Sequence, residues 1–449
     1  MPRNRSLPTP PRSSTAPGPR GYPLLGILPQ MRQDPLQCLM EAACRYGGVV
    51  SLPLGPKRAY LMAHPDSIKH VLQDNHRNYR KDRRIDKLKP LLGNGLFMSE
   101  GAFWYRQRRL MQPAFHRQRI AALATAMVEA IEEMLQHWRA YAERGTAIDI
   151  AAEMMQLTLN IIGKTMFGAD ISLEEAQSVG WALPTVLAHL KHPHRREFQH
   201  ALQTLNQIVF RIIDQRRRDG TAREDLLALL LDARDEETGA PMSDTQLRDE
   251  VMTIFLAGHE TTATALTWTW YLLATHPEEE ERLHKEIAGV LGGRTPTFQD
   301  LSSLPLTRMV IEEAMRLYPP IWLTSRIAVA DDHIGGYAIP ANAVIFLSPY
   351  VMHRHPDFWD HPTRFDPERF LPERVAARPR YAYFPFLGGP RQCIGNNFAL
   401  IEAQLIVALI TRSYQLRLTS TAPVDPHPGH TLRPRQPILM LLHPRSAGA

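Results

Sequence analysis

The sequence is poor in cysteine, with only Cys38, Cys44 and Cys393 among 449 residues. Three thiols are too few for a disulfide framework, which favours a reducing compartment, and we expect the cytoplasm. No apolar run approaches the roughly 20 residues that span a bilayer, so no transmembrane anchor is expected.

Acidic residues are missing from the first 33 positions, which carry five arginines. This pattern faintly suggests an organelle transit peptide. Six prolines among the first 20 residues oppose the amphipathic helix that such a peptide needs. We therefore expect a disordered lead-in over residues 1–20 and one folded domain over residues 21–449.

The overall charge is mildly basic, with a formal net charge of +6. No compact basic and aromatic motif of a nucleic-acid module is present, so no nucleic-acid partner is expected. A basic surface does fit an acidic protein partner, because complementary charge speeds encounter.

Apolar periodicity predicts a mainly helical fold with small β-sheets. Residues that favour β-strands are concentrated at positions 49–61 and again at about 326–348. The helical patterns cover residues 65–75, 102–117, 119–144, 148–167, 198–218, 244–275, 278–291, 306–317 and 394–412.

One cysteine follows a glycine-bearing loop and precedes a helical pattern: Phe386-Leu-Gly-Gly-Pro-Arg-Gln-Cys-Ile-Gly395. A helix N-terminus favours the thiolate of Cys393, and a single thiolate is what one axial bond to haem iron requires. Gly389 and Gly395 would let the backbone pass close to a flat ring. The alternative is a buried cysteine in an ordinary turn.

A second segment, Ala257-Gly-His-Glu-Thr-Thr262, lies inside a helix pattern that is apolar nearly all round. Glu260 beside Thr261 would make a proton relay, and Gly258 would leave room for oxygen and substrate. Threonine hydroxyls are expected to bond back to the preceding turn. Alone, the segment could be a core helix whose threonines cap a kink.

These two segments resemble the signatures of the cytochrome P-450 superfamily, Phe-x-x-Gly-x-Arg-x-Cys-x-Gly and Ala/Gly-Gly-x-Asp/Glu-Thr. Glu313-Ala-Met-Arg316 and Pro367-Glu-Arg-Phe370 resemble its Glu-x-x-Arg helix and partner arginine. The motifs stand in family order. The resemblance implies the single-domain cytochrome P-450 fold and a buried ion-pair network of Glu313, Arg316 and Arg369.

The resemblance also implies haem b (iron protoporphyrin IX) as cofactor, with Cys393 as the metal ligand. Trp104 and Arg108, at i and i+4, are expected against a haem propionate, and Arg326 and Arg391 are further candidates. The remaining cofactor contacts expected from the signature are Phe386 and Gly395.

The implied activity is that of a haem-thiolate monooxygenase, which inserts one atom of O₂ into a hydrophobic small molecule. Glu260 and Thr261 are the expected catalytic residues. The chain looks like the haem domain of bacterial fatty-acid hydroxylases, but a terpenoid-like substrate is nearly as well supported. The candidate pocket walls are Phe97, Ala257, Ile321 and Leu323.

Electrons are expected to come from NAD(P)H through a separate ferredoxin or flavodoxin with its reductase, and the protein is expected to be a monomer. Basic residues in and after the Trp104 helix, together with residues 76–89, could form a docking face for an acidic redox partner. The alternative is that they are only a solvated surface. Two alternatives are a peroxide-driven peroxygenase and a non-catalytic haem sensor. Neither needs an acid–threonine pair.

Overall fold

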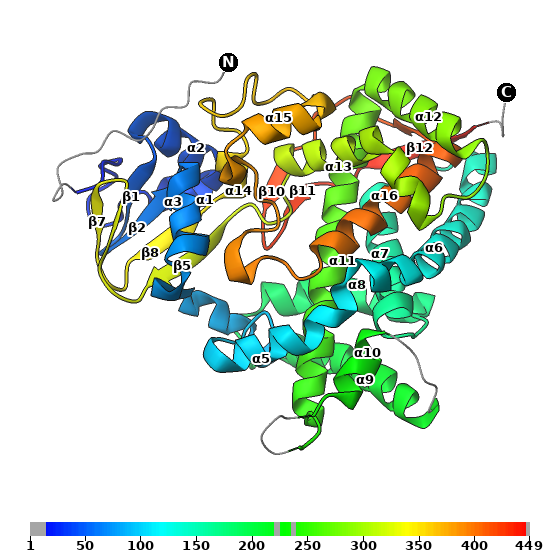
Figure 1. The fold of residues 1–449 in the computed structure, drawn as a ribbon, viewed down its shortest axis with the longest axis horizontal. Helices are drawn as coiled ribbons and strands as arrows, with labels where there is room; N and C mark the ends of the chain where they lie inside the picture. The colour runs from blue at the N-terminus through cyan, green and yellow to red at the C-terminus, as the bar shows by residue number, and fades with distance from the viewer. Residues whose placement is uncertain (1–14, 220–224, 235–238, 446–449) are drawn as a thin grey trace. The chain divides into compact units, whose positions relative to one another are not determined.

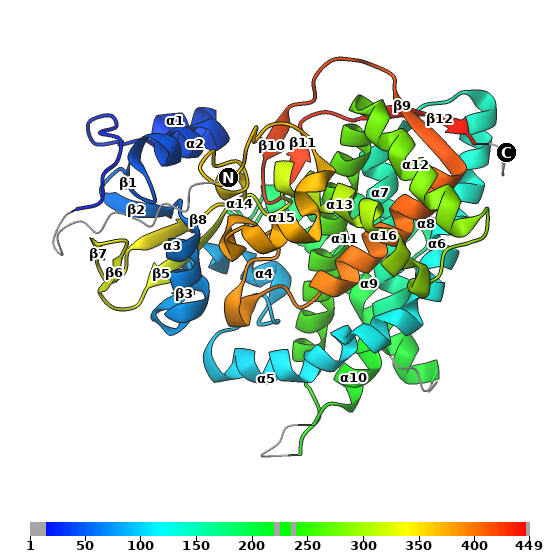
Figure 2. The ribbon, with the colours of Figure 1, turned by 45° about the horizontal axis from the view of Figure 1, so that its top comes forward.

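The computed structural model describes residues 15–219, 225–234 and 239–445, which form mainly helices with small β-sheets, as the sequence predicted (Figures 1 and 2). The chain divides into two compact units. Unit 1 is Met1–Asp82, Met309–Cys393 and Val424–Gln436, and unit 2 is Arg83–Arg308, Ile394–Pro423 and Pro437–Ala449.

Unit 1 is built on a five-stranded sheet of order β1-β2-β8-β5-β3, in which β2 and β8 are parallel and the other pairs antiparallel. Its strands are β1 (Val49–Leu54), β2 (Lys57–Met62), β3 (Tyr79–Lys81), β5 (Thr324–Ala328), β6 (Asp332–Ile334), β7 (Tyr337–Ile339), β8 (Val344–Leu347), β10 (Pro426–Pro428) and β11 (Leu432–Pro434). Its helices are α1 (Leu28–Gln33), α2 (Pro35–Tyr46), α3 (Pro65–Lys69), α13 (Pro305–Leu317, from Met309 on), α14 (Pro349–Met352) and α15 (Pro372–Ala377).

Alternating apolar residues of β1 and β2 fill both faces of this sheet. Val50 and Leu52 pack in one buried cluster with Leu39 of α2, while Val49 lies in the other with Ile345 of β8. The sheet is therefore covered on both sides, which suits a strand order that contains a parallel pair.

Unit 2 is mostly helical. Its helices are α4 (Lys89–Leu92), α5 (Gly101–Met111), α6 (Arg117–Arg144), α7 (Ile150–Met166), α8 (Leu173–Ala188), α9 (Arg196–Asp219), α10 (Leu226–Asp232), α11 (Asp244–Thr275), α12 (Pro277–Leu291) and α16 (Asn396–Ser413). Strands β4 (Ile148–Asp149), β12 (Leu439–Pro444) and β9 (Tyr414–Leu418) form a small antiparallel sheet in that order.

Helix α11 is the central element of unit 2, buried along most of its length as its uniformly apolar pattern predicted. It packs against α7, and α16 packs against α6, α12 and α11. Ser243 caps α11 by accepting a hydrogen bond from the Gln246 N–H at 3.2 Å.

The predicted strand pair at residues 49–61 and the long helices are confirmed, with ends that shift by a few residues. Helix α8, which runs for 16 residues with Pro184 inside it, was not predicted. The short elements α10 and β9–β12 were not predicted either, because their patterns are brief and depend on packing. Residues 15–20 are packed rather than disordered, since Ala16 is buried and the Pro17 carbonyl accepts from the Ser51 N–H at 2.7 Å. The rest of the expected lead-in, residues 1–14, lies outside the described residues.

Among the described residues, no helix combines the length and the apolar character that crossing a membrane requires.

Candidate functional site

The loop before α16 holds the thiol of Cys393 in an exposed position within unit 1. The Cys393 N–H donates to the Phe386 carbonyl at 3.0 Å, which closes the loop upon itself. Leu387 (φ 59°) and Gly389 (φ 67°) take left-handed conformations inside it. The loop therefore has a fixed course that leaves this thiol accessible.

Glycine in this loop is required by packing against the chain itself. A Cβ on Gly389 would lie 1.8 Å from the Leu72 carbonyl oxygen, and one on Gly388 would lie 2.5 Å from the Tyr381 ring. Gly389 was expected because the backbone would pass close to a flat ring. The structure gives another reason, which is that the backbone passes close to residues 72–73. Gly395, in unit 2, differs: its Cβ would meet only the Phe115 ring, at 3.7 Å.

The predicted ion-pair network lies in unit 1 and is buried. The Glu313 carboxylate accepts from Arg316 Nε at 2.7 Å and from its terminal nitrogen at 2.8 Å, a forked pair with no exposed surface on either side chain. Arg369 Nε stands 3.4 Å from the same carboxylate. Burial raises the pKa of Glu313, and the Arg316 guanidinium opposes that rise.

Further donors of Arg316 reach the chain that leads to the cysteine loop. They bond the carbonyls of His353 at 2.9 Å and Pro362 at 2.7 Å. His353 is itself buried, and its Nε2 accepts from the Phe384 N–H at 2.9 Å. Burial, reinforced by the Arg316 charge, lowers the pKa of His353 well below 6.5. The network thus tethers the backbone two residues before Phe386.

Of the other predicted residues of unit 1, Ile321 and Leu323 precede β5, Arg326 lies on it, and Arg391 lies in the loop before Cys393. Arg326 is buried, with a terminal nitrogen 2.9 Å from the Ser325 carbonyl, and Arg391 is half-buried. Ile321 is half-buried. Leu323 is partly buried against the core formed by α2, β1 and β2.

In unit 2, α11 carries the acid–threonine segment without interruption. Glu260 is buried. The Thr261 hydroxyl donates to the Ala257 carbonyl at 2.8 Å, and the Thr262 hydroxyl donates to the Gly258 carbonyl at 3.1 Å. The predicted bonding of threonines back to the preceding turn is confirmed.

Gly258 makes room for a neighbouring helix. A Cβ there would lie 2.5 Å from the Ile162 side chain of α7. The Thr158 hydroxyl of α7 also donates to the His259 carbonyl at 3.0 Å. The expectation that Gly258 leaves room for oxygen and substrate is thus corrected, because Ile162 fills the space where its side chain would stand.

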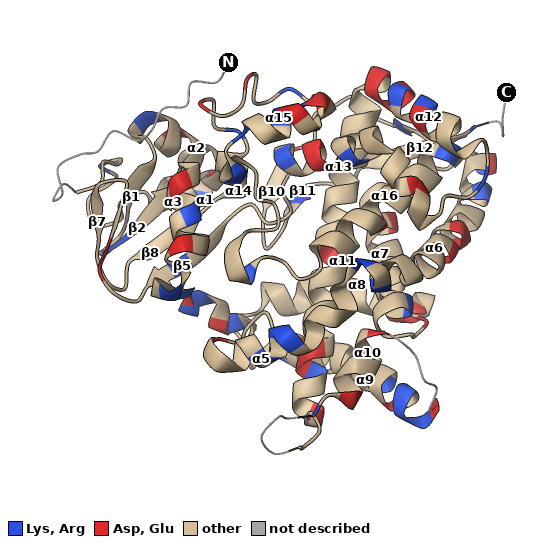
Figure 3. Cartoon of the chain, in the orientation of Figure 1, with Lys and Arg blue, Asp and Glu red and all other residues tan. Residues whose placement is uncertain are grey.

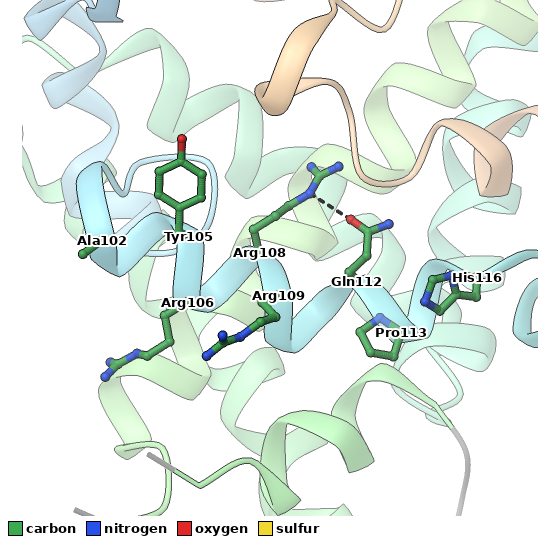
Figure 4. Close-up of a pocket in the computed structure, with 8 residues that line it drawn as sticks. All are labelled: Ala102, Tyr105, Arg106, Arg108, Arg109, Gln112, Pro113 and His116. Atoms are coloured by element: carbon green, nitrogen blue, oxygen red, sulfur yellow. Dashed lines mark hydrogen bonds between the residues drawn. The ribbon is translucent and has the colours of Figure 1, made fainter. Parts of the chain in front are cut away.

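The predicted pair on α5 takes up two different environments. Trp104 is buried, whereas Arg108 lines an open hollow of about 850 Å³, where its Nε donates to Gln112 at 3.0 Å (Figure 4). In that view Arg108 points away from Arg106 and Arg109. The full lining is Ala102, Tyr105, Arg106, Arg108, Arg109, Gln112, Pro113 and His116.

The segment that carries Phe97 is fastened to α11. Asp249 accepts from the Asn94 N–H and Glu250 from the Leu96 N–H, both at 2.8 Å. A Cβ on Gly95 would lie 2.2 Å from the Thr253 hydroxyl, so the two backbones approach closely. Phe97 then follows with 46% of its surface exposed.

The chemistry of the donor set fits haem. Among the described residues, no group of three or more His, Cys, Asp or Glu side chains could hold a metal ion. What these residues offer instead is an exposed thiol on a loop, Cys393, and separate arginines, which suit one axial thiolate bond and two propionates; the other exposed thiol, Cys44, lies within α2.

Sequence reasoning overlooked Glu402, the buried carboxyl in the middle of α16. The signal was present, because an acid conflicts with its surroundings in the run of residues 398–410, which is otherwise apolar except for Gln404. Sequence reasoning also missed the fastening of residues 94–96 by Asp249 and Glu250, since ordinary surface acids look the same in a sequence.

Comparisons with known proteins agree over nearly the whole chain. Residues 16–442 match the family model for cytochrome P450. The chain is 40% identical to cyclooctatin synthase of Streptomyces melanosporofaciens, covering 97% of this chain and 96% of that protein. It is 36% identical to pentalenene oxygenase of Streptomyces avermitilis, covering 92% and 93%.

A solved structure shares the fold. The crystal structure of the cytochrome P450DA heme domain superposes with a TM-score of 0.88 at 27% identity, covering 97% of this chain and 99% of that one. With the thiol loop, the buried ion-pair network and the acid–threonine helix in place, these matches settle the class of the protein. The chain belongs to the cytochrome P450 family and is a haem monooxygenase that uses O₂ and electrons from NAD(P)H delivered by redox partners.

Proposed function

We propose that Cys393 is the axial thiolate ligand of the haem in this enzyme. The observation that carries this assignment is the exposed thiol on a loop closed by the Cys393 N–H and Phe386 carbonyl. When bound, haem supplies the redox chemistry by which oxygen enters the substrate. Cys393 contributes the thiolate, and Phe386 contributes the carbonyl that orients its backbone.

Glu313, Arg316 and Arg369 are proposed to hold this loop in place. Their forked pair satisfies the buried Glu313 carboxylate, and the remaining donors of Arg316 bond the backbone that leads to the loop. The role is structural, because it fixes a course of chain and touches no reacting atom.

Trp104, Arg108, Arg326 and Arg391 are proposed to bind the haem propionates. Guanidinium groups form forked, charge-assisted bonds with carboxylates. Arg108 supports this best, since it lines the hollow along α5 while Gln112 fixes its Nε. Gly395 is proposed to contribute by its lack of a side chain, which leaves its surroundings open apart from Phe115.

Glu260 and Thr261 are proposed to carry protons to the site of oxygen reduction. The Thr261 hydroxyl donates its proton to the Ala257 carbonyl, so its oxygen lone pairs remain available to accept a hydrogen bond. It donates only when that bond opens, while Glu260 exchanges protons with water. This pair favours the O₂-dependent reaction over a peroxide-driven one and over a haem sensor.

The substrate is proposed to be a bulky apolar molecule of terpenoid type. Relatives that cover nearly the whole chain are named cyclooctat-9-en-7-ol 5-monooxygenase and pentalenene oxygenase, and both names denote molecules with an unsaturated carbon skeleton. Phe97 and Ala257, which are both exposed in unit 2, are proposed as pocket walls. Ile321 and Leu323, in unit 1, stay predicted wall residues. A fatty acid is less well supported.

The electron donor is proposed to be a ferredoxin or flavodoxin with its reductase, and the enzyme to be a cytoplasmic monomer. Basic residues colour α5 and the segment before it in Figure 3. Arg109 and Arg117 are exposed, whereas Arg106 and Arg119 are half-buried. An acidic partner surface would complement this charge.

The test of the proton relay is Thr261→Ala in the haem-loaded enzyme with its redox partners. Loss of the hydroxyl is expected to raise peroxide release per NAD(P)H by about tenfold or more, because proton transfer by a positioned group is worth at least that much. Thr261→Ser, which keeps the hydroxyl, should restore product formation.

The matched control is Thr267→Ala on the same helix, where the hydroxyl also bonds back one turn, to Ala263 at 2.7 Å. Coupling should be unchanged in this variant. Equal coupling in Thr261→Ala and the native enzyme would contradict the relay.

A further inference from the structure

Asp332, the first residue of β6, is the centre of a group of hydrogen bonds with no part in the proposed chemistry. Its Oδ2 accepts from His70 Nε2 at 2.8 Å, from the Asn75 side-chain amide at 2.9 Å and from the Tyr79 hydroxyl at 2.5 Å. Its Oδ1 accepts from the His333 N–H at 2.7 Å. Only 13% of the Asp332 side-chain surface is exposed. Both carboxylate oxygens are therefore bonded, and the donors come from separate parts of unit 1.

Two of these donors stand at the two ends of one turn. The segment η1 (His70–Asp74) is a π-turn that follows α3 directly, and the Asn75 N–H closes it by donating to the His70 carbonyl at 2.8 Å. In an α-helix, with about 3.6 residues per turn, side chains five residues apart point away from one another. The wider π-turn brings the side chains of His70 and Asn75 to one oxygen. Asp332 therefore favours the π-turn over a continued α-helix.

This π-turn lies against the loop of Cys393, in the same unit. Element η1 packs against η8 (Gly389–Arg391), the short turn that ends two residues before the cysteine. A Cβ on Gly389 would lie 1.8 Å from the Leu72 carbonyl oxygen and 3.2 Å from the Gln73 Cα. The two backbones are thus in contact, and a shift of the π-turn would displace the loop.

A second contact joins the π-turn to the chain that enters the loop. The buried Tyr381 donates from its hydroxyl to the Gln73 side-chain oxygen at 2.9 Å. The Gln73 carbonyl accepts from His76 Nδ1 at 2.9 Å. Tyr381 also shares one buried apolar cluster with Ile334 of β6 and Leu72 of η1. The β6–β7 hairpin, the π-turn and the chain before the loop therefore pack as one body.

The charge of Asp332 suits this arrangement. Burial would raise its pKa, but the hydrogen bonds from Tyr79 and His70 outweigh burial, so the pKa lies below 3.8. Burial, together with the bond to Asp332, raises the pKa of the Tyr79 hydroxyl. At neutral pH the acid is ionised and the phenol keeps its proton, which is the state in which these bonds form.

We propose that Asp332 is a positioning residue for the thiolate of Cys393. By binding both ends of the π-turn, Asp332 sets where the Leu72 carbonyl stands, and that carbonyl lies against the Gly389 backbone of the cysteine loop. The effect passes through the backbone, and Asp332 touches no reacting atom. The role towards the thiolate rests on the proposal that Cys393 binds the haem, whereas the hold on the loop does not.

The direct test is hydrogen exchange of the haem-loaded enzyme, followed by mass spectrometry, in the native protein and in Asp332→Ala. Peptides that cover residues 70–76 and 386–393 should exchange several-fold faster in the variant, because the Asn75 and Cys393 N–H groups are both bonded to backbone carbonyls there. Native exchange in both segments would overturn the proposal. So would a change confined to residues 70–76, since the loop would then be independent of Asp332.

Asp331→Ala is the matched control in the same hairpin. Asp331 is exposed, and its Oδ1 accepts from the Ala341 N–H at 2.7 Å, a bond that does not reach the π-turn. Its loss should leave exchange at residues 386–393 unchanged. Equal increases in the two alanine variants would assign the effect to general loosening of the hairpin and would overturn the positioning role.

The effect on the thiolate is measured by the CO difference spectrum of the reduced enzyme. In Asp332→Ala a several-fold larger share of the Soret band than in Asp331→Ala should move to the position of haem without a thiolate ligand. Asp332→Asn keeps one acceptor oxygen for the π-turn and should lie between the alanine variant and the native enzyme. It carries both measurements if Asp332→Ala does not fold.

A native spectrum in Asp332→Ala would overturn the role towards the thiolate, even with faster exchange in the loop. If instead Cys393→Ser keeps the red-shifted band, the assignment of the haem ligand fails, while hydrogen exchange still decides whether Asp332 holds the loop.

Discussion

Two buried glutamates, one in each unit, show what decides the charge of an acid inside this protein. Glu313 in unit 1 and Glu402 in unit 2 both have fully buried side chains. Glu313 accepts two bonds from Arg316 and one from the Asp366 N–H at 2.9 Å. Glu402 receives none from the described residues. Burial is the same, so the donors make the difference: Arg316 opposes the rise that burial causes in the pKa of Glu313, whereas no basic side chain of the described residues opposes it at Glu402, whose pKa is raised well above 4.5.

The largest expected effect comes from removing a donor at the charged site. Arg316→Leu would leave the Glu313 carboxylate buried with only Arg369 and one N–H, at a cost of about 3–5 kcal/mol in the free energy of unfolding. Denaturant unfolding of the haem-loaded enzyme measures it, and haem retention should fall as well.

Arg374→Leu is the surface counterpart of that variant. Arg374 is half exposed, and its nitrogen stands 3.8 Å from Asp366. Its loss should cost no more than about 1 kcal/mol. Equal costs for the two arginines would contradict the view that the Glu313 pair is a buried, fully bonded unit.

A third buried group, the base His353, extends the comparison to pH. Its pKa is lowered by burial, so the folded protein holds it neutral while the unfolded chain takes up a proton below pH 6.5. The stability that it contributes is therefore complete above pH 6.5 and is lost as the pH falls towards its folded pKa.

The groups that face His353 strengthen this expectation. The charges of Arg316, Arg354 and Arg378 all lower its pKa, and its Nε2 must stay unprotonated to accept from the Phe384 N–H. Unfolding free energy should drop by up to about 1.4 kcal/mol per pH unit below 6.5. In His353→Gln that part of the slope should vanish, and an unchanged slope would point to other groups.

The smallest expected effect is at Glu402. Glu402→Leu should change the free energy of unfolding by no more than about 1 kcal/mol, and the change can have either sign. The reason is that an apolar side chain replaces an acid to which no group of the described residues donates a hydrogen bond. Denaturant unfolding beside Arg316→Leu measures the contrast. A loss as large as that of Arg316→Leu would mean that Glu402 is charged and paired.

The sequence predicted the elements that carry their own local signal. Three features need no help from distant residues. They are the nearly all-apolar sequence of α11, the strand pair β1–β2 and the i, i+3 spacing of Glu313 and Arg316, and each defines a face or a turn by itself. The back-bonding of Thr261 was predictable for the same reason, since its acceptor is one turn away.

What the sequence did not predict depends on residues far apart in the chain. Ile162 fills the space beside Gly258, and the Leu72 carbonyl stands where a Cβ of Gly389 would be. Glu402 is buried in unit 2 partly because α16 packs on α11. No local pattern encodes such contacts. Gly258 was therefore assigned to oxygen and substrate and Gly389 to a flat ring, although the groups nearest to them are protein.

The measurement that tests the account most directly is the CO difference spectrum of the reduced enzyme, recorded for the native protein, Cys393→Ser and Cys38→Ser. Cys38 is partly buried against the core of unit 1 and serves as the control thiol. The account predicts a strongly red-shifted Soret band in the native enzyme and in Cys38→Ser, and its loss in Cys393→Ser. A native band at the position of histidine-ligated haem, or a red-shifted band that survives Cys393→Ser, would contradict it.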